Sequence, residues 1–203
     1  MNRIAPTLEK IVAFYDSCMI GQEGTEGYRK STDLGRFLPC VCHLRESGVV
    51  NPATSIFLDL GCADGRVNIL MSYFVRTSIG VEVDPEILAE YGPRRKELLE
   101  VLGRGGLVKP TGNVHLFSGD SLRPGTHHRI RQSLGIRLQD VDLFYTYLTL
   151  HDLFGAMIAS GAKAGARFLV YGFHKVLPHY HGLDVVDPDV AGQGIAALYE
   201  VRR

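Results

Sequence analysis

Residues 55–66 of the chain read SIFLDLGCADGR. The first part is short and apolar and ends at Gly61, a pattern typical of a buried parallel strand. The small residues Gly61, Ala63 and Gly65 let the backbone approach a ligand closely, and glycine can take a positive φ. A helix that begins at Arg66 offers free backbone N–H groups beside this loop. The stretch therefore predicts a strand, a ligand-binding loop and a helix.

The rest of the chain alternates between apolar strand patterns and helical patterns. Further strands are expected at 78–83, 114–118, 141–147, 167–173, 183–186 and 195–201. Helices are expected at 66–74, 84–102 and 151–161. Strands that alternate with helices form βαβ units and a parallel sheet. We therefore predict an α/β fold with a doubly wound, mostly parallel sheet of seven strands and helices on both faces.

Two more helices are predicted ahead of the first strand. One covers 7–20, with Thr7 as its N-cap, and the other runs from Ser31 or Thr32 to about 47. Both carry apolar residues on one face, at spacings of three and four. Pro39 lies inside the second pattern, so a kink or a later start is expected there.

The length of 203 residues suits one domain or at most two. We expect residues 1–50 to form an N-terminal helical cap and residues 51–203 to form the ligand-binding domain, as a single compact unit. Proline and charged residues stand where a signal peptide needs its apolar run, and no stretch approaches 18 uninterrupted apolar residues. The four cysteines are too few for a disulfide scaffold. These features predict a cytoplasmic protein that does not cross a membrane.

The distribution of charge carries more information than its sum. Lysine and arginine number 22, as do aspartate and glutamate, so the formal net charge is zero. This excludes a protein that is basic over its whole surface. Residues 94–137, however, hold nine bases and three acids. This basic segment is either a solvated face or a patch for RNA or an acidic partner surface.

The residues around the loop distinguish between two classes of ligand. A dinucleotide fingerprint would need its third glycine where Arg66 stands. Asp59 and Asp64 flank the loop, and acids suit a ligand that carries an ammonium and a sulfonium. Glu82 ends the second predicted strand, where an acid can accept hydrogen bonds from both hydroxyls of a ribose. A nucleotide-dependent oxidoreductase is therefore the weaker hypothesis.

At these residues the chain resembles the class I, seven-strand S-adenosylmethionine-dependent methyltransferases. Residues 59–65 match the first motif of that family, with Ala63 in place of its commonest middle glycine, and residues 80–84 match the second. Residues 118–121 match the segment that contacts adenine. The resemblance implies S-adenosylmethionine as cofactor, held by Asp59, Gly61, Cys62, Ala63, Asp64, Gly65, Glu82, Val83, Asp120, Ser121 and Tyr145.

A narrower set of residues is similar to the seven-strand protein-lysine methyltransferases. It adds the upstream segment Tyr28-Arg29-Lys30-Ser31-Thr32, which in that family closes over the cofactor. The chain departs from the pattern at Cys62-Ala63, where the family has Ser-Gly, and at Val83-Asp84, where it has Leu-Asn. This resemblance implies that the methyl acceptor is a protein lysine side chain.

Tyr145 and Tyr147 are the candidate catalytic residues, because two alternating tyrosines suit an aromatic wall for a lysine side chain. Alternation points both the same way, so both line the site or both are core. His151 with Asp152 is interpreted as the start of a helix, and His174, His179 and His181 as a loop at the pocket mouth. No metal site is predicted.

Other acceptors and partners stay open. No Asn/Asp-Pro-Pro-Tyr/Phe tetrapeptide follows the fourth strand, which lowers the case for an adenine or glutamine acceptor. A methyltransferase that acts on a small molecule or RNA is an alternative to the protein-lysine hypothesis. A non-catalytic S-adenosylmethionine-binding protein is another, because the acceptor motif is missing. No feature indicates an oligomeric state.

Overall fold

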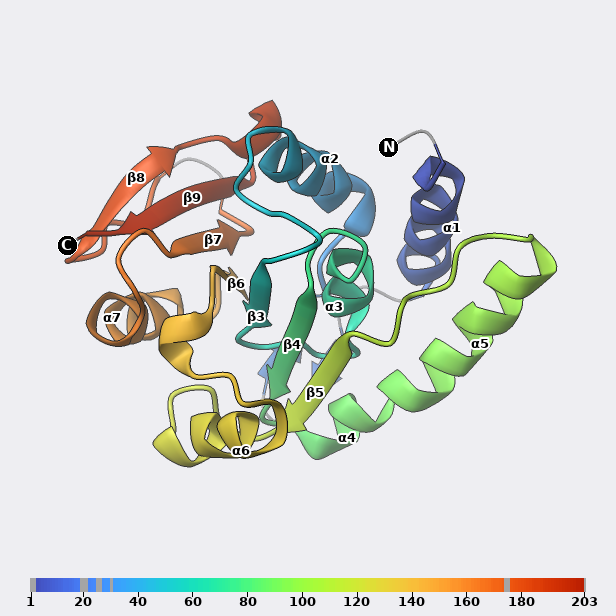
Figure 1. Cartoon of the computed structure of the whole chain (residues 1–203), viewed down its shortest axis with the longest axis horizontal. Helices are drawn as coiled ribbons and strands as arrows, with labels where there is room; N and C mark the ends of the chain where they lie inside the picture. Colours follow the sequence, from blue (N-terminus) through green and yellow to red (C-terminus); the bar gives the residue numbers. More distant parts are fainter. Residues whose placement is uncertain (1–2, 19–21, 25–26, 30, 174–175, 203) are drawn as a thin grey trace.

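A computed structural model describes residues 3–18, 22–24, 27–29, 31–173 and 176–202. A seven-stranded sheet lies between two layers of helices, and its strand order is β5-β4-β3-β6-β7-β9-β8 (Figure 1). The strands are β3 (Ile56–Asp59), β4 (Thr77–Glu82), β5 (Val114–Ser118), β6 (Leu143–Tyr147), β7 (Arg167–Tyr171), β8 (Leu183–Asp187) and β9 (Ala196–Val201). All seven coincide with strand patterns predicted from the sequence.

The sheet is mixed rather than wholly parallel. Neighbours among β3, β4, β5, β6 and β7 pair in parallel, whereas β9 pairs antiparallel with both β7 and β8. Only residues 188–195 connect β8 to β9, and they include the short helix η2 (Val190–Gly192). So short a connection cannot provide the crossover that parallel neighbours need, so the chain turns back on itself.

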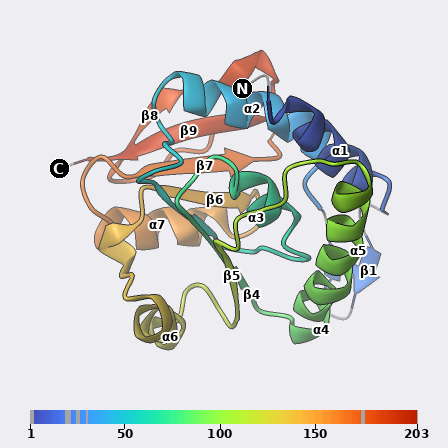
Figure 2. The same cartoon turned by 45° about the vertical axis from the view of Figure 1, so that its right-hand side comes forward.

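The two helical layers enclose separate cores (Figure 2). One layer holds α1 (Ala5–Asp16), α2 (Leu34–Glu46), α3 (Arg66–Met71) and α5 (Tyr91–Arg104). There Ile11, Phe37 and Leu98 pack with Phe57 of the sheet. The other layer holds α6 (Pro124–Leu134) and α7 (His151–Gly161), whose buried residues pack against Phe168. Both N-terminal helices therefore share one core with α3 and α5.

The N-terminal helices differ in their limits from the sequence prediction. Helix α1 begins at Ala5, because Pro6 fits the first helical turn, where no backbone N–H needs a partner. Thr7 is buried instead of capping, and its hydroxyl oxygen accepts a hydrogen bond from the Val108 N–H (3.1 Å). Helix α2 begins at Leu34 after the N-cap Asp33 and runs through the position of Pro39, where one backbone hydrogen bond is lost.

Three elements were not anticipated as they occur. Helix α6 has only a few apolar residues among many cationic ones, so its helical period is weak. The glycine-rich segment after α1 forms the hairpin β1 (Gln22–Gly24) and β2 (Gly27–Arg29). The single helix expected at 84–102 divides into α4 (Pro85–Ala89) and α5, although Asp84 caps α4 as predicted. In the described part of the chain, no helix is both long and apolar enough to cross a bilayer.

Candidate active site

The loop at residues 60–65 follows β3 at the carboxyl edge of the sheet. Its backbone is held by hydrogen bonds from the Cys62 N–H to the Val81 carbonyl (2.9 Å) and from the Gly65 N–H to the Cys62 carbonyl (2.8 Å). A Cβ added at Gly61 would meet no atom within 4 Å, whereas one at Gly65 would meet Tyr91 at 2.7 Å. The loop is therefore open above Gly61 and tightly packed at Gly65.

Ala63 takes a left-handed backbone conformation, with φ of 47°. A side chain other than glycine is strained there, because its Cβ approaches the following carbonyl oxygen. In this conformation the Ala63 N–H donates a hydrogen bond to Oε2 of Glu82 (2.9 Å). Position 63 thus connects the loop to the end of the neighbouring strand.

Glu82 ends β4 and is nearly buried. Its Oε1 accepts a hydrogen bond from the Asp84 N–H (3.0 Å) while Oε2 accepts from Ala63. These two bonds hold the carboxylate at the junction of the loop and the strand. Each carboxylate oxygen has a second lone pair, so Glu82 can accept further bonds from a ligand's hydroxyls.

Asp59, the last residue of β3, lies beneath the loop. It is almost fully buried, and its Oδ1 accepts a hydrogen bond from the Gly61 N–H (3.3 Å). Burial raises the pKa of Asp59 to about 8, and the nearby carboxylates of Glu82 and Asp64 add to the rise. At neutral pH the Asp59 carboxyl is therefore mostly protonated, and a cation placed beside it would favour its ionised form.

Asp64 has different partners from those expected of a ligand-binding acid. Its carboxylate is fully buried and accepts hydrogen bonds from the guanidinium of Arg66, the shortest from Nε to Oδ1 (3.0 Å) and from Nη2 to Oδ2 (2.9 Å), and one from the backbone N–H of Arg66 (3.2 Å). Arg94 Nε lies 3.6 Å from Oδ2, and the Arg66 guanidinium lies over the ring of Tyr15 (5.5 Å). The negative charge of Asp64 is thus balanced by two guanidinium groups. These contacts tie the loop to α1 and α5, so the Asp64 side chain faces the protein interior.

Cys62 also points its side chain inward. The thiol is buried, and its Cβ would lie 2.7 Å from a Cβ at Gly80. Burial raises the pKa of the Cys62 thiol well above its ordinary value. Only the backbone of Cys62 is therefore placed to contact a ligand.

The segment after β5 completes the edge of the site. The Gly119 N–H donates to the Glu82 carbonyl (2.8 Å), and the Ser121 hydroxyl donates to the Leu60 carbonyl (2.9 Å). These bonds fasten the segment to the loop and to β4. Val83 stands beside it with 63% of its surface exposed, and the partly exposed Asp120 uses Oδ1 to accept from the Leu122 N–H (2.8 Å).

The two tyrosines of β6 share one face of the sheet but differ in surroundings. Tyr145 is buried, with its ring 5.1 Å from that of Phe37 and its hydroxyl 2.7 Å from Oγ1 of Thr32. Tyr147 is partly buried and lies 5.6 Å from the ring of Tyr171. Both tyrosines contact the same hydrophobic core, and Tyr147 is the less buried of the two.

This placement changes what Tyr145 can do. Burial raises its pKa well above the ordinary value, and the nearby Asp59 carboxyl adds to the rise. Its hydroxyl is therefore neutral, and it is hydrogen-bonded to Thr32. This geometry favours a structural role for Tyr145 over the expected catalytic one. Both Ser31 and Thr32 are buried. Lys30 and the side chains of Tyr28 and Arg29 lie outside the described residues.

The histidines considered from the sequence differ in their surroundings. His151 begins α7, and its Nδ1 lies 2.7 Å from the hydroxyl of Tyr180. His179 and His181 are exposed, and His174 lies outside the described residues. Among the residues that the structure describes, no group of three or more His, Cys, Asp or Glu side chains could hold a metal ion.

Comparisons with known proteins find similarity in structure but not in sequence. No protein-family model and no curated protein matches the chain. A candidate RNA methyltransferase from Pyrococcus horikoshii superposes with a TM-score of 0.55 at 16% identity, and all of both chains is covered. An RNA methyltransferase from Salinibacter ruber, in complex with S-adenosylhomocysteine, gives 0.52 at 16% identity, covering 81% of this chain and 92% of that one.

A candidate O-methyltransferase from Klebsiella pneumoniae gives a TM-score of 0.54 at 13% identity, covering 98% of this chain and 90% of that one. Two of these proteins are described as RNA methyltransferases and the third as an O-methyltransferase, and all three share one architecture with this chain. At such identities the likeness concerns the fold. The chain therefore has the Rossmann-like, seven-strand α/β fold of the class I S-adenosylmethionine-dependent methyltransferases.

Proposed function

We propose that the protein is an S-adenosylmethionine-dependent methyltransferase. The observation that carries this proposal is the Glu82 carboxylate, which Ala63 and Asp84 hold between the open loop and the exposed Val83. The loop at residues 60–65, the segment at residues 82–84 and the segment at residues 118–121 stand at the ends of β3, β4 and β5, which are adjacent in the sheet. Their carboxyl ends form a row, which suits an elongated ligand with an amino acid at one end and a nucleobase at the other.

The residues in this row fit that cofactor. Glu82 would accept hydrogen bonds from the ribose hydroxyls, using the lone pairs that Ala63 and Asp84 leave free. The exposed side chain of Val83 would pack on the adenine ring, and Asp120 would accept from the exocyclic amine. The open backbone at Gly61 would admit the methionine portion, whose ammonium and sulfonium favour an ionised Asp59.

When bound, the cofactor supplies an electrophilic methyl group on a sulfonium. The acceptor atom would take that methyl group and would give up a proton. The chain contributes by holding the acceptor in line with the methyl group and by excluding water. Tyr147, partly buried at the end of β6, would contact the acceptor.

For the acceptor we favour RNA over a protein lysine. Besides the family resemblance, the lysine hypothesis drew on an aromatic wall of Tyr145 and Tyr147, and Tyr145 is buried with its hydroxyl bonded to Thr32. RNA methyltransferases are among the proteins with a similar fold, which supports RNA as the acceptor class. A small-molecule acceptor is the remaining alternative, because the structural neighbours also include a candidate O-methyltransferase.

Two measurements test the proposal. Titration calorimetry with S-adenosylmethionine should show binding that Glu82→Ala weakens about 10- to 100-fold, since hydrogen bonds to a charged group contribute roughly 1.5–3 kcal/mol each. The exposed Glu97→Ala on α5 is the matched control. Absence of binding by the unaltered protein would overturn the proposed function.

The second measurement identifies the acceptor. The protein and methyl-labelled cofactor are incubated with cell lysate, which is then digested separately with protease and with nuclease. Label that becomes soluble only after nuclease treatment supports RNA, and label released only by protease supports a protein acceptor. Label in low-molecular-weight material supports a small molecule. Binding of the cofactor without transfer to any fraction would favour the non-catalytic alternative.

A further inference from the structure

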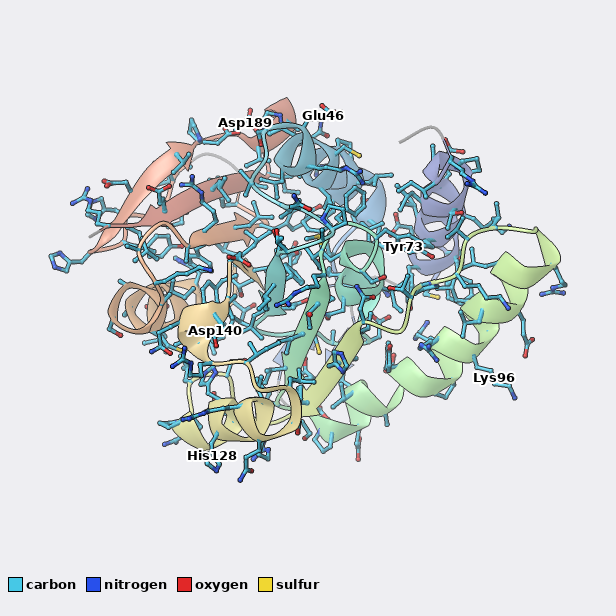
Figure 3. All side chains as sticks on the ribbon, viewed as in Figure 1. Glu46, Tyr73, Lys96, His128, Asp140 and Asp189 are labelled. Carbon is cyan, nitrogen blue, oxygen red and sulfur yellow. The ribbon has the colours of Figure 1, made fainter. Side chains whose placement is uncertain are left out.

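Helices α6 and α7 lie on the face of the sheet opposite α1 and α2 (Figure 1). Residues of both helices line a groove of about 410 Å³. Apolar side chains of Leu122, Leu138 and Met157 line part of it. The cationic or ionisable side chains along it are His127, His128, Arg131 and Arg137. Figure 3 shows His128 on the side of α6 that faces away from the sheet.

The charge of this groove is strongly one-sided. Residues 121–139 contain no aspartate or glutamate but hold four arginines and two histidines. Arg137 pairs with Asp140 (3.2 Å), on the short helix η1 (Leu138–Asp140) between α6 and α7. Arg131 and His128 are exposed, and no ion pair to either is found among the residues that the structure describes. The groove therefore presents unneutralised positive charge to solvent.

The groove is adjacent to the candidate active site. Helices α6 and α7 both begin at the carboxyl edge of the sheet, at Pro124 and His151, so the space between them leads toward that edge. The Nε2–H of His127 donates a hydrogen bond to the Ser121 carbonyl (2.7 Å), because a carbonyl can only accept. Ser121 in turn donates to Leu60 of the ligand-binding loop. Leu122, which lines the groove, directly follows Ser121, so one end of the groove lies next to the segment that completes the site.

We propose that this groove binds a single strand of the RNA substrate, an inference that rests on the proposed function. Arg131 and His128 contact backbone phosphates, and the apolar surface of Leu122, Leu138 and Met157 receives a base. Exposed cations beside an apolar surface are the combination that single-stranded nucleic acids use, since each nucleotide brings both a charge and a flat ring. An acidic protein surface would use the charges but not the apolar floor.

The test measures binding of a fluorescent single-stranded RNA oligonucleotide by anisotropy over a series of salt concentrations. Arg131→Glu is compared with Arg104→Glu, which makes the same charge change at an exposed arginine in the last turn of α5. We expect Arg131→Glu to weaken RNA binding about five- to ten-fold, and Arg131→Ala to lower the salt slope by about 0.7, the value for one phosphate contact to a single strand. Arg104→Glu should change neither quantity.

Equal losses in both variants, or no loss in Arg131→Glu, would overturn the proposal. A second arm adds polyglutamate as competitor at the same charge concentration, and displacement as efficient as that by unlabelled RNA would also overturn it. Calorimetry with S-adenosylmethionine on the same variants separates this failure from that of the proposed function. Intact cofactor binding with an unaffected RNA affinity would reject the groove alone.

Discussion

The hydroxyl of Tyr145 lies 2.7 Å from Oγ1 of Thr32, across 113 positions of sequence. Both side chains are buried, so neither hydroxyl can turn to water. The bond fastens the segment before α2 to the middle of β6, where Tyr145 pairs with Asp59 of β3. It therefore links the N-terminal part of the chain to β6, the strand next to β3 in the sheet.

Removal of one partner of this bond should destabilise the protein. Tyr145→Phe leaves the Thr32 hydroxyl buried without its partner, which costs about 1–3 kcal/mol. The double variant Thr32→Val with Tyr145→Phe should lose less than the sum of the single variants. Denaturant unfolding of all four proteins measures the coupling, and strict additivity would contradict it. Methyl transfer by folded Tyr145→Phe should stay within a few-fold of the unaltered protein, because this hydroxyl is not expected to act in catalysis.

The raised pKa of Asp59 should make stability depend on pH. The folded protein retains a proton on Asp59 up to about pH 8, whereas the unfolded chain loses it near 3.8. The folded state therefore binds more protons between these values, and the free energy of unfolding should fall as pH rises from about 4 to about 8. Asp59→Asn should flatten this slope in urea unfolding series. An unchanged slope in the variant would contradict the assignment to Asp59.

The same carboxyl should respond to the cofactor. A ligand with an ammonium and a sulfonium favours ionised Asp59, so binding at pH 7 should release a proton, and affinity should rise with pH toward about 8. Calorimetry in two buffers of different ionisation enthalpy measures the proton released. Asp59→Asn should release none from this position, and equal release by both proteins would contradict the prediction.

The buried pair of Asp64 and Arg66 should be sensitive to the loss of one partner. Arg66→Met leaves the Asp64 carboxylate buried with only Arg94 nearby at 3.6 Å. Breaking such a pair costs about 3–5 kcal/mol, since one charge is left uncompensated. The double variant Asp64→Asn with Arg66→Met should recover part of the loss. Urea unfolding compares the two, and a double variant less stable than Arg66→Met would contradict this reasoning.

The left-handed conformation of Ala63 should be relieved by glycine. Ala63→Gly removes the clash of Cβ at φ of 47° and should raise the free energy of unfolding by about 1 kcal/mol. Ala156→Gly, at an exposed position in α7, is the matched control. Glycine in a regular helix should lower the free energy of unfolding by about 0.5–1 kcal/mol. Thermal unfolding of both variants distinguishes these outcomes, and a loss of stability in Ala63→Gly would contradict the strain.

Sequence reasoning predicted the strands well because their signals are local. The apolar run before Asp59 and the glycines after it specify a strand and a loop within a dozen residues, and Asp84-Pro85 similarly marks the start of α4. Helix α6 was missed because its polar and basic surface leaves few apolar positions. The antiparallel direction of β9 depends on its pairing with β7 and β8, which its own strand pattern does not specify.

The sequence by itself therefore determined the seven strands, their βα order and the loop that includes Gly61, Ala63 and Gly65. Only the tertiary structure decided where the side chains of the site point. Asp64 turns to Arg66, Tyr145 is buried against Thr32, and Glu82 receives the Ala63 N–H. Local patterns encode backbone conformation, whereas the direction and burial of a side chain depend on neighbours brought together by folding.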